Sequence, residues 1–392
     1  MHFPRVVLKA GKDKPVRAFH PWIFSGAIDL VDESCKPGGL VSVHAKDNSF
    51  LGIGYFNSNS QISVRMLTFK QEEISADFFK RKIETAVELR KSFISENTNA
   101  YRLIHSEGDF LPGLIVDRYA DFLVVQFQTL GIEVLKPSIL EALKSIGGIQ
   151  GIYERCDPAV NKFEGMDKKS AVLFGSEPPE LVETQENGCR FYVDIHNGQK
   201  TGFFLDQRDN RKLIGKISKG KRVLNCFSYT GGFSIYARKG GASEVTSVEI
   251  SEKVTELAKK NFQLNQIESA NYKFISQDVF DYLREDKAEY DLIILDPPAF
   301  CKNKHQVMEA SRGYKDINLF AMKRLAQGGI LFTASCSSHI SQDLFQKIIF
   351  AAAKDAKRDV QVLKKTAHPM DHPVNIYHPE GEYLKGLLCR VI

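Results

Sequence analysis

The chain has 392 residues, and a working size of about 150 residues per domain predicts two or three domains. A composition of 43% hydrophobic and 26% charged residues is typical of a folded protein and excludes a disordered or low-complexity chain. The net charge of +5, from 53 Lys and Arg against 48 Asp and Glu, is only mildly basic.

The seven cysteines are odd in number, and no two stand in a C-x-x-C pair, which argues against a disulfide framework and against a zinc site. We therefore expect no metal, and a reducing compartment. The N-terminal residues contain no apolar run of signal-peptide length, and no stretch approaches the ~18 apolar residues of a membrane span. These features predict a cytoplasmic protein without a membrane partner.

Residues 1–70 are expected to form a small β-barrel, because short runs of Val, Ile and Phe alternate with turn residues. The polar and aromatic segment 14–28 is expected to be irregular. This region holds nine Lys and Arg against five Asp and Glu, nearly all of the basic excess of the chain. Such a basic end is typical of a nucleic-acid contact, for which Lys12, Lys14 and Arg17 are the candidates; the alternative is a solvated face.

Residues 71–180 predict a small α+β domain that ends in a linker at 175–180, where Gly and Pro gather. Its expected elements are a helix over 76–93, two strands over 113–128, one helix over 132–146 and a strand over 151–156.

From residue 181 to residue 392, apolar strands alternate with helical patterns, which predicts a doubly wound, Rossmann-like α/β sheet. Ligands of such sheets bind beyond the carboxyl ends of the strands, where the strand order reverses. The expected strands are 222–227, 244–250, 272–278, 290–298, 329–337, 360–363 and 383–392.

The first of these strands runs into a loop with adjacent glycines and no Gly-x-Gly-x-x-Gly. A dinucleotide needs that spacing to bring its pyrophosphate to a helix N-terminus, whereas S-adenosylmethionine (SAM) has no phosphate and needs only a close approach to the backbone. The sequence therefore predicts SAM as the cofactor. The loop residues expected to bind it are Phe227, Ser228, Tyr229, Thr230, Gly231 and Gly232.

Acidic residues end the next two strands. Glu249 is placed to accept hydrogen bonds from the ribose hydroxyls, and Asp278 from the adenine amino group. Either acid alone could be a helix N-cap, but the order of the signals along the strands favours a cofactor site. Further upstream, Arg208 is a candidate for binding the methionine carboxylate and Asp206 for orienting it, with a helix N-cap as the alternative for Asp206.

The fourth strand ends in the turn Asp-Pro-Pro-Ala-Phe, residues 296–300. Its prolines fix the backbone, so that the acid and the ring face the methyl end of the cofactor. Asp296 is therefore a candidate for both cofactor binding and catalysis, while Pro297 and Phe300 are candidates for holding a flat base by stacking. The alternative is a rigid turn without function.

The fifth strand ends at Cys336, among serines rather than in the apolar run. Carbon 5 of cytosine is a poor nucleophile, and a thiolate that adds at carbon 6 makes it reactive. Cys combines strong nucleophilicity with partial ionisation near neutral pH, so we expect Cys336 to be the catalytic nucleophile. Cys226 and Cys301 are weaker candidates, and Asp296 and Glu380 both stay open as the base that removes the carbon-5 proton.

Several segments together resemble the bacterial large-subunit ribosomal RNA cytosine-5 methyltransferase I family over the whole chain: QKTGFFLDQRDNR, NCFSYTGGFS, LDPPAF, RGYKDIN, SCSS and HPEGEYLKGLLCRVI. The resemblance implies a PUA domain, a central α/β domain and a SAM-dependent methyltransferase domain that methylates ribosomal RNA. It also implies a homodimer, Cys336 as the nucleophile, and a SAM site formed by residues 227–232 with Glu249, Asp278 and Asp296.

Three alternatives stay open. The Asp-Pro-Pro turn with its aromatic residue resembles motifs that methylate an exocyclic amine of an RNA base without a thiol. A nicotinamide oxidoreductase could use a similar sheet, although the phosphate loop is missing. An RNA-binding factor without catalysis would need only the N-terminal barrel.

Overall fold

The computed structural model describes residues 3–392, without the side chain of Ser269, and groups the chain into two units. The first unit runs to Thr184 and includes Val193–Leu205 and Met370–Gly381; the second contains Gln185–Tyr192, Asp206–Pro369 and Glu382–Ile392. The predicted domain limits at residues 70 and 180 stay a prediction.

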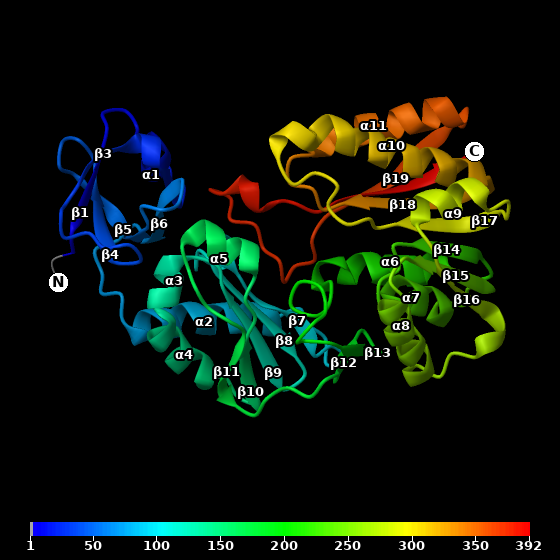
Figure 1. Cartoon of the computed structure of the whole chain (residues 1–392), viewed down its shortest axis with the longest axis horizontal. Helices are drawn as coiled ribbons and strands as arrows, with labels where there is room; N and C mark the ends of the chain where they lie inside the picture. Colours follow the sequence, from blue (N-terminus) through cyan, green and yellow to red (C-terminus); the bar gives the residue numbers. More distant parts are fainter. Residues whose placement is uncertain (1–2) are drawn as a thin grey trace. The chain divides into compact units, whose positions relative to one another are not determined.

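The N-terminal part of the first unit is a six-stranded sheet in the order β2-β6-β5-β4-β1-β3, drawn in blue in Figure 1. β1 and β4 run parallel, and the other neighbours run antiparallel. Aliphatic side chains such as Val6, Val43 and Val64 form its core. Its elements are β1 (Arg5–Leu8), α1 (Lys14–Arg17), β2 (Trp22–Phe24), β3 (Ile28–Val31), β4 (Leu40–His44), β5 (Phe50–Phe56) and β6 (Ile62–Thr68).

The expectation of an irregular segment 14–28 was wrong. This segment contains α1, β2 and the start of β3. β2 has only three residues, with Trp22 opposite Arg65 of β6. A strand this short shows no alternation of its own, so its pairing with β6 defines it.

The rest of the first unit is built on a five-stranded sheet in the order β11-β10-β9-β8-β7. Phe79 and Ile83 of α2 and Leu143 of α4 pack into one core with Val116 and Leu123 of the sheet. The elements are α2 (Ala76–Lys91), β7 (Ala100–His105), β8 (Leu114–Tyr119), β9 (Phe122–Phe127), α3 (Leu130–Val134), α4 (Lys136–Lys144), β10 (Gly151–Glu154), α5 (Pro158–Glu164) and β11 (Ala171–Gly175).

The single helix expected over 132–146 is two helices, α3 and α4, which meet at Leu135. Pro137 lies in the first turn of α4, where its missing N–H costs no helical hydrogen bond, but it cannot continue the hydrogen bonds of α3. The apolar spacing runs through this break, which is why the pattern suggested one helix.

The second unit contains a seven-stranded sheet in the order β16-β15-β14-β17-β18-β20-β19. The first five strands in this order are parallel, and β20 runs antiparallel to both β18 and β19. This arrangement confirms the predicted doubly wound α/β sheet, with its order reversing between β14 and β17. The strands are β14 (Arg222–Cys226), β15 (Glu244–Glu249), β16 (Tyr272–Ser276), β17 (Tyr290–Leu295), β18 (Leu325–Ser335), β19 (Val360–Thr366) and β20 (Lys385–Val391).

Helices cover both faces of this sheet, with α9, α10 and α11 on one face and α6, α7 and α8 on the other (Figure 1). Tyr314 of α10 and Phe345 of α11 belong to one buried core, and Ile214 of α6 and Phe233 of α7 belong to the other. The helices are α6 (Arg208–Ile217), α7 (Gly232–Lys239), α8 (Glu252–Leu264), α9 (Val279–Glu285), α10 (Val307–Arg324) and α11 (Gln342–Ala356).

The remaining elements are short. β12 pairs with β13 in a separate two-stranded sheet, and the others are single 3-10 turns. Their bounds are β12 (Val182–Glu186), β13 (Cys189–Val193), η1 (Ser25–Ala27), η2 (Ser106–Asp109), η3 (Leu205–Gln207), η4 (Ser269–Asn271), η5 (Lys304–Gln306) and η6 (Pro379–Gly381).

Candidate active site

Four residues predicted for the site lie at the carboxyl edge of the sheet in the second unit. Phe227 follows β14, Glu249 ends β15, Asp296 follows β17 and Cys336 follows β18. Because these strands are parallel and adjacent, their carboxyl ends lie along one edge of the sheet, on both sides of the point where the strand order reverses. Doubly wound sheets bind their ligands there.

The loop after β14 has a strained backbone. Phe227 and Tyr229 have φ angles of 57° and 46°, in the left-handed region that residues with a Cβ rarely adopt. Gly231, with a φ angle of 81°, lies in the same region. A Cβ at Gly231 would lie 3.3 Å from Cε2 of Phe262, tighter than ordinary contact. Strain of this kind is typical of functional sites, and here it shapes the backbone of the predicted cofactor loop.

Glu249 fixes this loop to the end of β15. Its Oε2 accepts a hydrogen bond from the N–H of Tyr229 at 3.0 Å, and its Oε1 accepts one from the N–H of Ser251 at 3.1 Å. Each carboxylate oxygen has room for a further donor. The N-cap of α8 is Ser251, so the alternative reading of Glu249 as an N-cap is not observed.

Asp278, in contrast, is the N-cap of α9. Its Oδ1 accepts hydrogen bonds from the N–H groups of Phe280 at 2.8 Å and Asp281 at 3.3 Å. The same carboxylate has a second oxygen, so an N-cap and a contact to adenine are compatible. Its predicted role in cofactor binding stays a prediction.

Asp206 is buried and does not cap α6, whose N-cap is Gln207. The Oδ2 atom of Asp206 accepts a hydrogen bond from the hydroxyl of Tyr383 at 2.7 Å. Arg208 is also buried, as the first residue of α6, and its Nε lies 3.6 Å from Oδ1 of Asp209. Their predicted contacts with the methionine part of SAM stay predictions.

Gln207, which was not among the predicted site residues, holds Asp296 in place. Its Nε2 donates to Oδ1 of Asp296 at 2.6 Å, and its Oε1 accepts from Nδ2 of Asn210 at 2.6 Å. Asn210 lies one turn further along α6, so the helix orients the Gln207 amide and the amide orients the carboxylate. In the sequence, the only indication of this role was that Gln207 is a polar residue between two candidate site residues, Asp206 and Arg208.

Cys336 is half-buried, and both neighbours in the chain are locked in place. Ser335 Oγ donates to the hydroxyl of Tyr314 at 3.0 Å, and that hydroxyl lies 3.0 Å from Ser337 Oγ. All three side chains are buried, and burial raises the pKa of Tyr314, so its hydroxyl stays protonated. The Sγ of Cys336 lies 4.0 Å from the carbonyl oxygen of Pro297, so the thiol lies beside the Asp-Pro-Pro turn.

Lys385, the first residue of β20, is a further group beside this segment. It lies opposite Ser335 in the pairing of β18 with β20, and its Nζ donates to the carbonyl oxygen of Ser337 at 2.7 Å. Burial lowers the pKa of Lys385 to about 8, against the opposing effect of Cys336 and Glu382. The signal in the sequence was a lysine inside an apolar strand, since buried lysines are rare unless paired.

Pro297 is buried, whereas Phe300 is partly buried in a cluster of aromatic rings. The Phe300 ring centroid lies 4.7 Å from that of Tyr314, 5.8 Å from Phe280 and 6.2 Å from Phe227. Protein rings thus already surround the residue predicted to stack on a base, and that role stays a prediction.

The two weaker thiol candidates differ from Cys336 in burial. Cys226 is fully buried and its pKa is strongly raised by that burial, which disfavours a thiolate. Cys301 is also buried, and its Sγ lies 3.2 Å from the carbonyl oxygen of Asn303. Of the three, only Cys336 is not fully buried.

Glu380 lies in η6 of the first unit, with its side chain half exposed. Its carboxylate is 3.5 Å from Nε2 of His20 and 3.9 Å from Nε2 of His378, whose ring lies 4.3 Å from that of Trp22. Within its own unit, the Glu380 carboxylate therefore lies beside these rings. Its predicted role as the base stays a prediction without support from a contact.

The three basic candidates of the N-terminal region differ from one another. Lys12 and Lys14 are exposed, and no ion pair of theirs occurs within the described residues. Arg17 is exposed too, but its Nε lies 2.5 Å from Oδ2 of Asp13, and its Nη2 lies 3.9 Å from Oδ2 of Asp47. The charge of Arg17 is therefore largely balanced by its neighbours.

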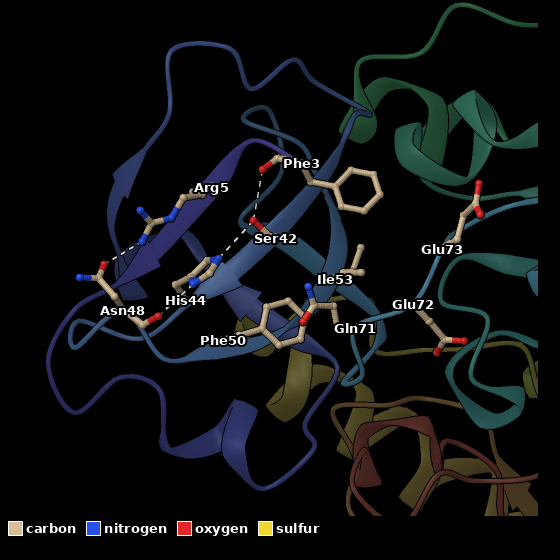
Figure 2. Close-up of a pocket in the computed structure, with 10 residues that line it drawn as sticks. All are labelled: Phe3, Arg5, Ser42, His44, Asn48, Phe50, Ile53, Gln71, Glu72 and Glu73. Carbon is tan, nitrogen blue, oxygen red and sulfur yellow. Dashed lines mark hydrogen bonds between the residues drawn. The ribbon is translucent and has the colours of Figure 1, made fainter. Parts of the chain in front are cut away.

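A separate pocket of about 620 Å³ opens on the N-terminal sheet (Figure 2). Arg5 Nη2 donates to Oδ1 of Asn48 at 2.7 Å, and His44 Nε2 lies 3.2 Å from Ser42 Oγ. The pocket contains none of the predicted site residues. It is lined by Phe3, Arg5, Ser42, His44, Asn48, Phe50, Ile53, Gln71, Glu72 and Glu73.

The residues at the edge of the second unit's sheet fit SAM. The carboxylate oxygens of Glu249 can accept further hydrogen bonds from ribose hydroxyls. The loop before α7 allows a ligand to approach its backbone closely, and it lacks the glycine spacing of a phosphate-binding loop. The hydroxyl of Thr230, in the same loop, is buried and has no hydrogen-bond partner among the described residues. A buried polar group without a partner is costly, so a ligand that bonds to it would be favoured.

Comparisons with known proteins agree with this geometry. Residues 161–377, more than half of the chain, match the family of S-adenosylmethionine-dependent methyltransferases. Residues 6–69 match the PUA-like domain. The fold and the site therefore define a SAM-dependent methyltransferase that carries a PUA-like domain, as the sequence predicted.

The particular family follows from the curated relatives. The proteins named ribosomal RNA large subunit methyltransferase I from Aeromonas salmonicida and Aliivibrio fischeri are 47% and 45% identical to this chain over 390 and 392 residues, covering 98% and 99% of both sequences. A solved SAM-dependent methyltransferase from Streptococcus mutans is 27% identical, with a TM-score of 0.85 over 100% of both chains. A methyltransferase crystallised with SAH is 28% identical, with a TM-score of 0.86 over the same coverage. The chain belongs to the ribosomal RNA large subunit methyltransferase I family.

The remaining expectations concern membrane contact, metal binding, location and assembly. Within residues 3–392, no helix is both long and apolar enough to cross a membrane. The seven cysteines are free, and no group of metal-binding side chains occurs in that same range. The cytoplasmic location and the homodimer stay predictions.

Proposed function

We propose that this protein uses SAM to methylate carbon 5 of a cytosine in large-subunit ribosomal RNA, with Cys336 as the nucleophile. The names of these relatives support ribosomal RNA as the substrate. The observation that carries the proposed chemistry is the half-buried thiol of Cys336 at the carboxyl end of β18, beside the turn that begins with Asp296.

The thiolate of Cys336 adds to carbon 6 of the cytosine, and the electrons of the double bond move to carbon 5. SAM, when bound, would supply an electrophilic methyl group to carbon 5, and its sulfur–methyl bond would break to leave SAH. A base then removes the carbon-5 proton, the electrons of that bond restore the double bond, and the bond to sulfur breaks to return the thiolate. Ser335 and Ser337 hold the sulfur in position through Tyr314.

Asp296 is the better supported of the two candidate bases. It belongs to the same unit as Cys336 and follows β17, the parallel neighbour of β18. Gln207 orients this carboxylate through a hydrogen bond to its Oδ1. Glu380 has no corresponding support.

The test compares Cys336→Ala with Cys35→Ala. Cys35 is also half-buried, but it lies in the first unit and has no proposed role in the reaction. We expect Cys336→Ala to abolish methylation of ribosomal RNA while calorimetry shows unchanged SAM binding, and Cys35→Ala to keep both. RNA that contains 5-fluorocytidine should trap a covalent adduct with the wild type and not with Cys336→Ala, because fluorine cannot leave carbon 5 as a proton does.

The main alternative is methylation of an exocyclic amine by the Asp-Pro-Pro-Ala-Phe turn. In that reaction Asp296 accepts a hydrogen of the amine and no thiol takes part. Retained methylation in Cys336→Ala would therefore favour this alternative. Mass-spectrometric mapping of ribosomal RNA with and without the gene would identify the modified position in either case.

A further inference from the structure

Lys385 lies where a positive charge can act on the Cys336 sulfur. β20 pairs antiparallel with β18, and this pairing puts Lys385 directly opposite Ser335, the residue before Cys336. The ammonium donates at 2.7 Å to the carbonyl oxygen of Ser337, the residue after Cys336. The lysine is thereby positioned by both residues that flank Cys336 in the chain.

The surroundings of the two groups favour an interaction between them. Lys385 is 4% exposed, so little water screens its charge, and it interacts electrostatically with Cys336. Glu382, on the exposed approach to β20, also acts on Lys385, and Tyr314 of α10 also interacts with Cys336. The Tyr314 hydroxyl is neutral, so it does not oppose a thiolate.

Two other half-buried cysteines have the opposite environment. Burial and the negative charge of Asp32 raise the pKa of Cys35. Burial and the carboxylate of Glu154 raise the pKa of Cys156, although Lys168 acts against them. Burial is the larger cause at both cysteines and a neighbouring carboxylate is the second, whereas the charged group beside Cys336 is a lysine.

We propose that Lys385 is the positioning residue that ionises Cys336, holding the thiolate ready beside its ammonium group. The Sγ–H bond of Cys336 breaks, its proton binds the lone pair of the neutral Lys385 amine, and the electron pair stays on sulfur. The proton transfer needs no other reactant. The role of Lys385 in catalysis rests on the function proposed above, whereas the ionisation of Cys336 by Lys385 does not.

The lowered pKa of Lys385 is consistent with this transfer. With a pKa of about 8, a part of the lysine is neutral near pH 7 and can take up a proton. Once the proton has moved, the two opposite charges stabilise each other in a site with little water. Thiolates beside lysine are known to form at lower pH than free cysteine, whose pKa is about 8.5.

The test is the pH profile of alkylation by iodoacetamide, followed at each cysteine separately by peptide mass spectrometry. In the wild type we expect Cys336 to titrate at lower pH than Cys35. In Lys385→Met the pKa of Cys336 should rise by at least one unit, so that its alkylation at pH 7 slows about tenfold. Lys385→Arg keeps the charge and should retain most of the reactivity, and Lys365→Met, at an exposed site on β19, should change nothing.

Two results would overturn the proposal. One is a wild-type protein in which the pKa of Cys336, measured by alkylation, equals or exceeds that of Cys35. This measurement needs no variant. The other is a Lys385→Met protein that binds SAH normally and shows an unchanged Cys336 profile, which would leave Lys385 a purely structural role. Failure of the proposed function would appear elsewhere, as retained methylation in Cys336→Ala, so the two failures are distinguishable.

Discussion

The hydroxyl of Tyr314 should control the position of Cys336, and Tyr314→Phe tests this directly. The substitution keeps the ring, which packs against Phe300 and Phe345, and removes only the oxygen that joins Ser335 and Ser337. All three side chains are at most 1% exposed, so water cannot replace the lost partner.

The magnitude follows from the two hydrogen bonds. At about 1 kcal/mol each, their loss should destabilise the end of β18 by about 2 kcal/mol. Local free energies of this kind are measured by amide hydrogen exchange, and about 2 kcal/mol corresponds to a roughly thirtyfold loss of protection. Because the Cys336 sulfur is then less well held, methyl transfer to ribosomal RNA should slow on the order of tenfold.

A matched control comes from Tyr119 in the first unit. This tyrosine is also buried, and its hydroxyl lies 2.9 Å from Thr201 Oγ1 and accepts from the N–H of Phe203 at 3.2 Å. Tyr119→Phe should reduce protection in β8 and leave β18 unchanged. If Tyr314→Phe kept full protection at β18 and normal methyl transfer, the idea that this hydroxyl fixes Cys336 would be refuted.

Three further predictions concern the binding surfaces. Glu249→Gln should weaken SAM binding at least about tenfold in calorimetry, because the lost charge weakens hydrogen bonds worth roughly 1.5–3 kcal/mol. The control is Glu252→Gln, at an exposed site on α8. Equal SAM affinities of the two variants would contradict the assignment of Glu249 to the cofactor site. Reversing the charges of Lys12 and Lys14 together should weaken RNA binding and flatten its salt dependence, and an unchanged slope would mean that both are merely solvated. Arg17→Glu should have a smaller effect, because Asp13 already balances that charge.

The sheet of the second unit was predictable because its central strands β14, β15, β17 and β18 contain buried apolar runs. Glu249 and Cys336 could be placed at one edge from this pattern alone, since parallel strands in a doubly wound sheet end on the same side. In the first unit, β7, α5 and β11 escaped prediction. β11 is largely exposed and shows little alternation, and β2 is too short to show any.

The contacts between residues of the candidate active site were harder to predict than the identity of those residues. Lys385 lies opposite Ser335 only because β20 is inserted antiparallel beside β18, and neither the strand order nor the register can be read from one sequence. Likewise, Gln207 reaches Asp296 across 89 positions of the chain. Glu380 lies in the range 181–392, for which the sequence pattern predicted one last domain, whereas the structure groups it with the first unit.

The segment Met370–Gly381 belongs to the first unit although β19 and β20, which flank it in the chain, belong to the second. Inside the first unit, the buried guanidinium of Arg90 donates to the carbonyl oxygen of Asp371 at 2.7 Å, and the carboxylate of Asp371 accepts from the N–H of Arg102 at 3.0 Å. A fragment cut at about residue 180 would lose these partners. The two halves of the gene therefore cannot be expressed separately, or exchanged between relatives, without a break in the first unit.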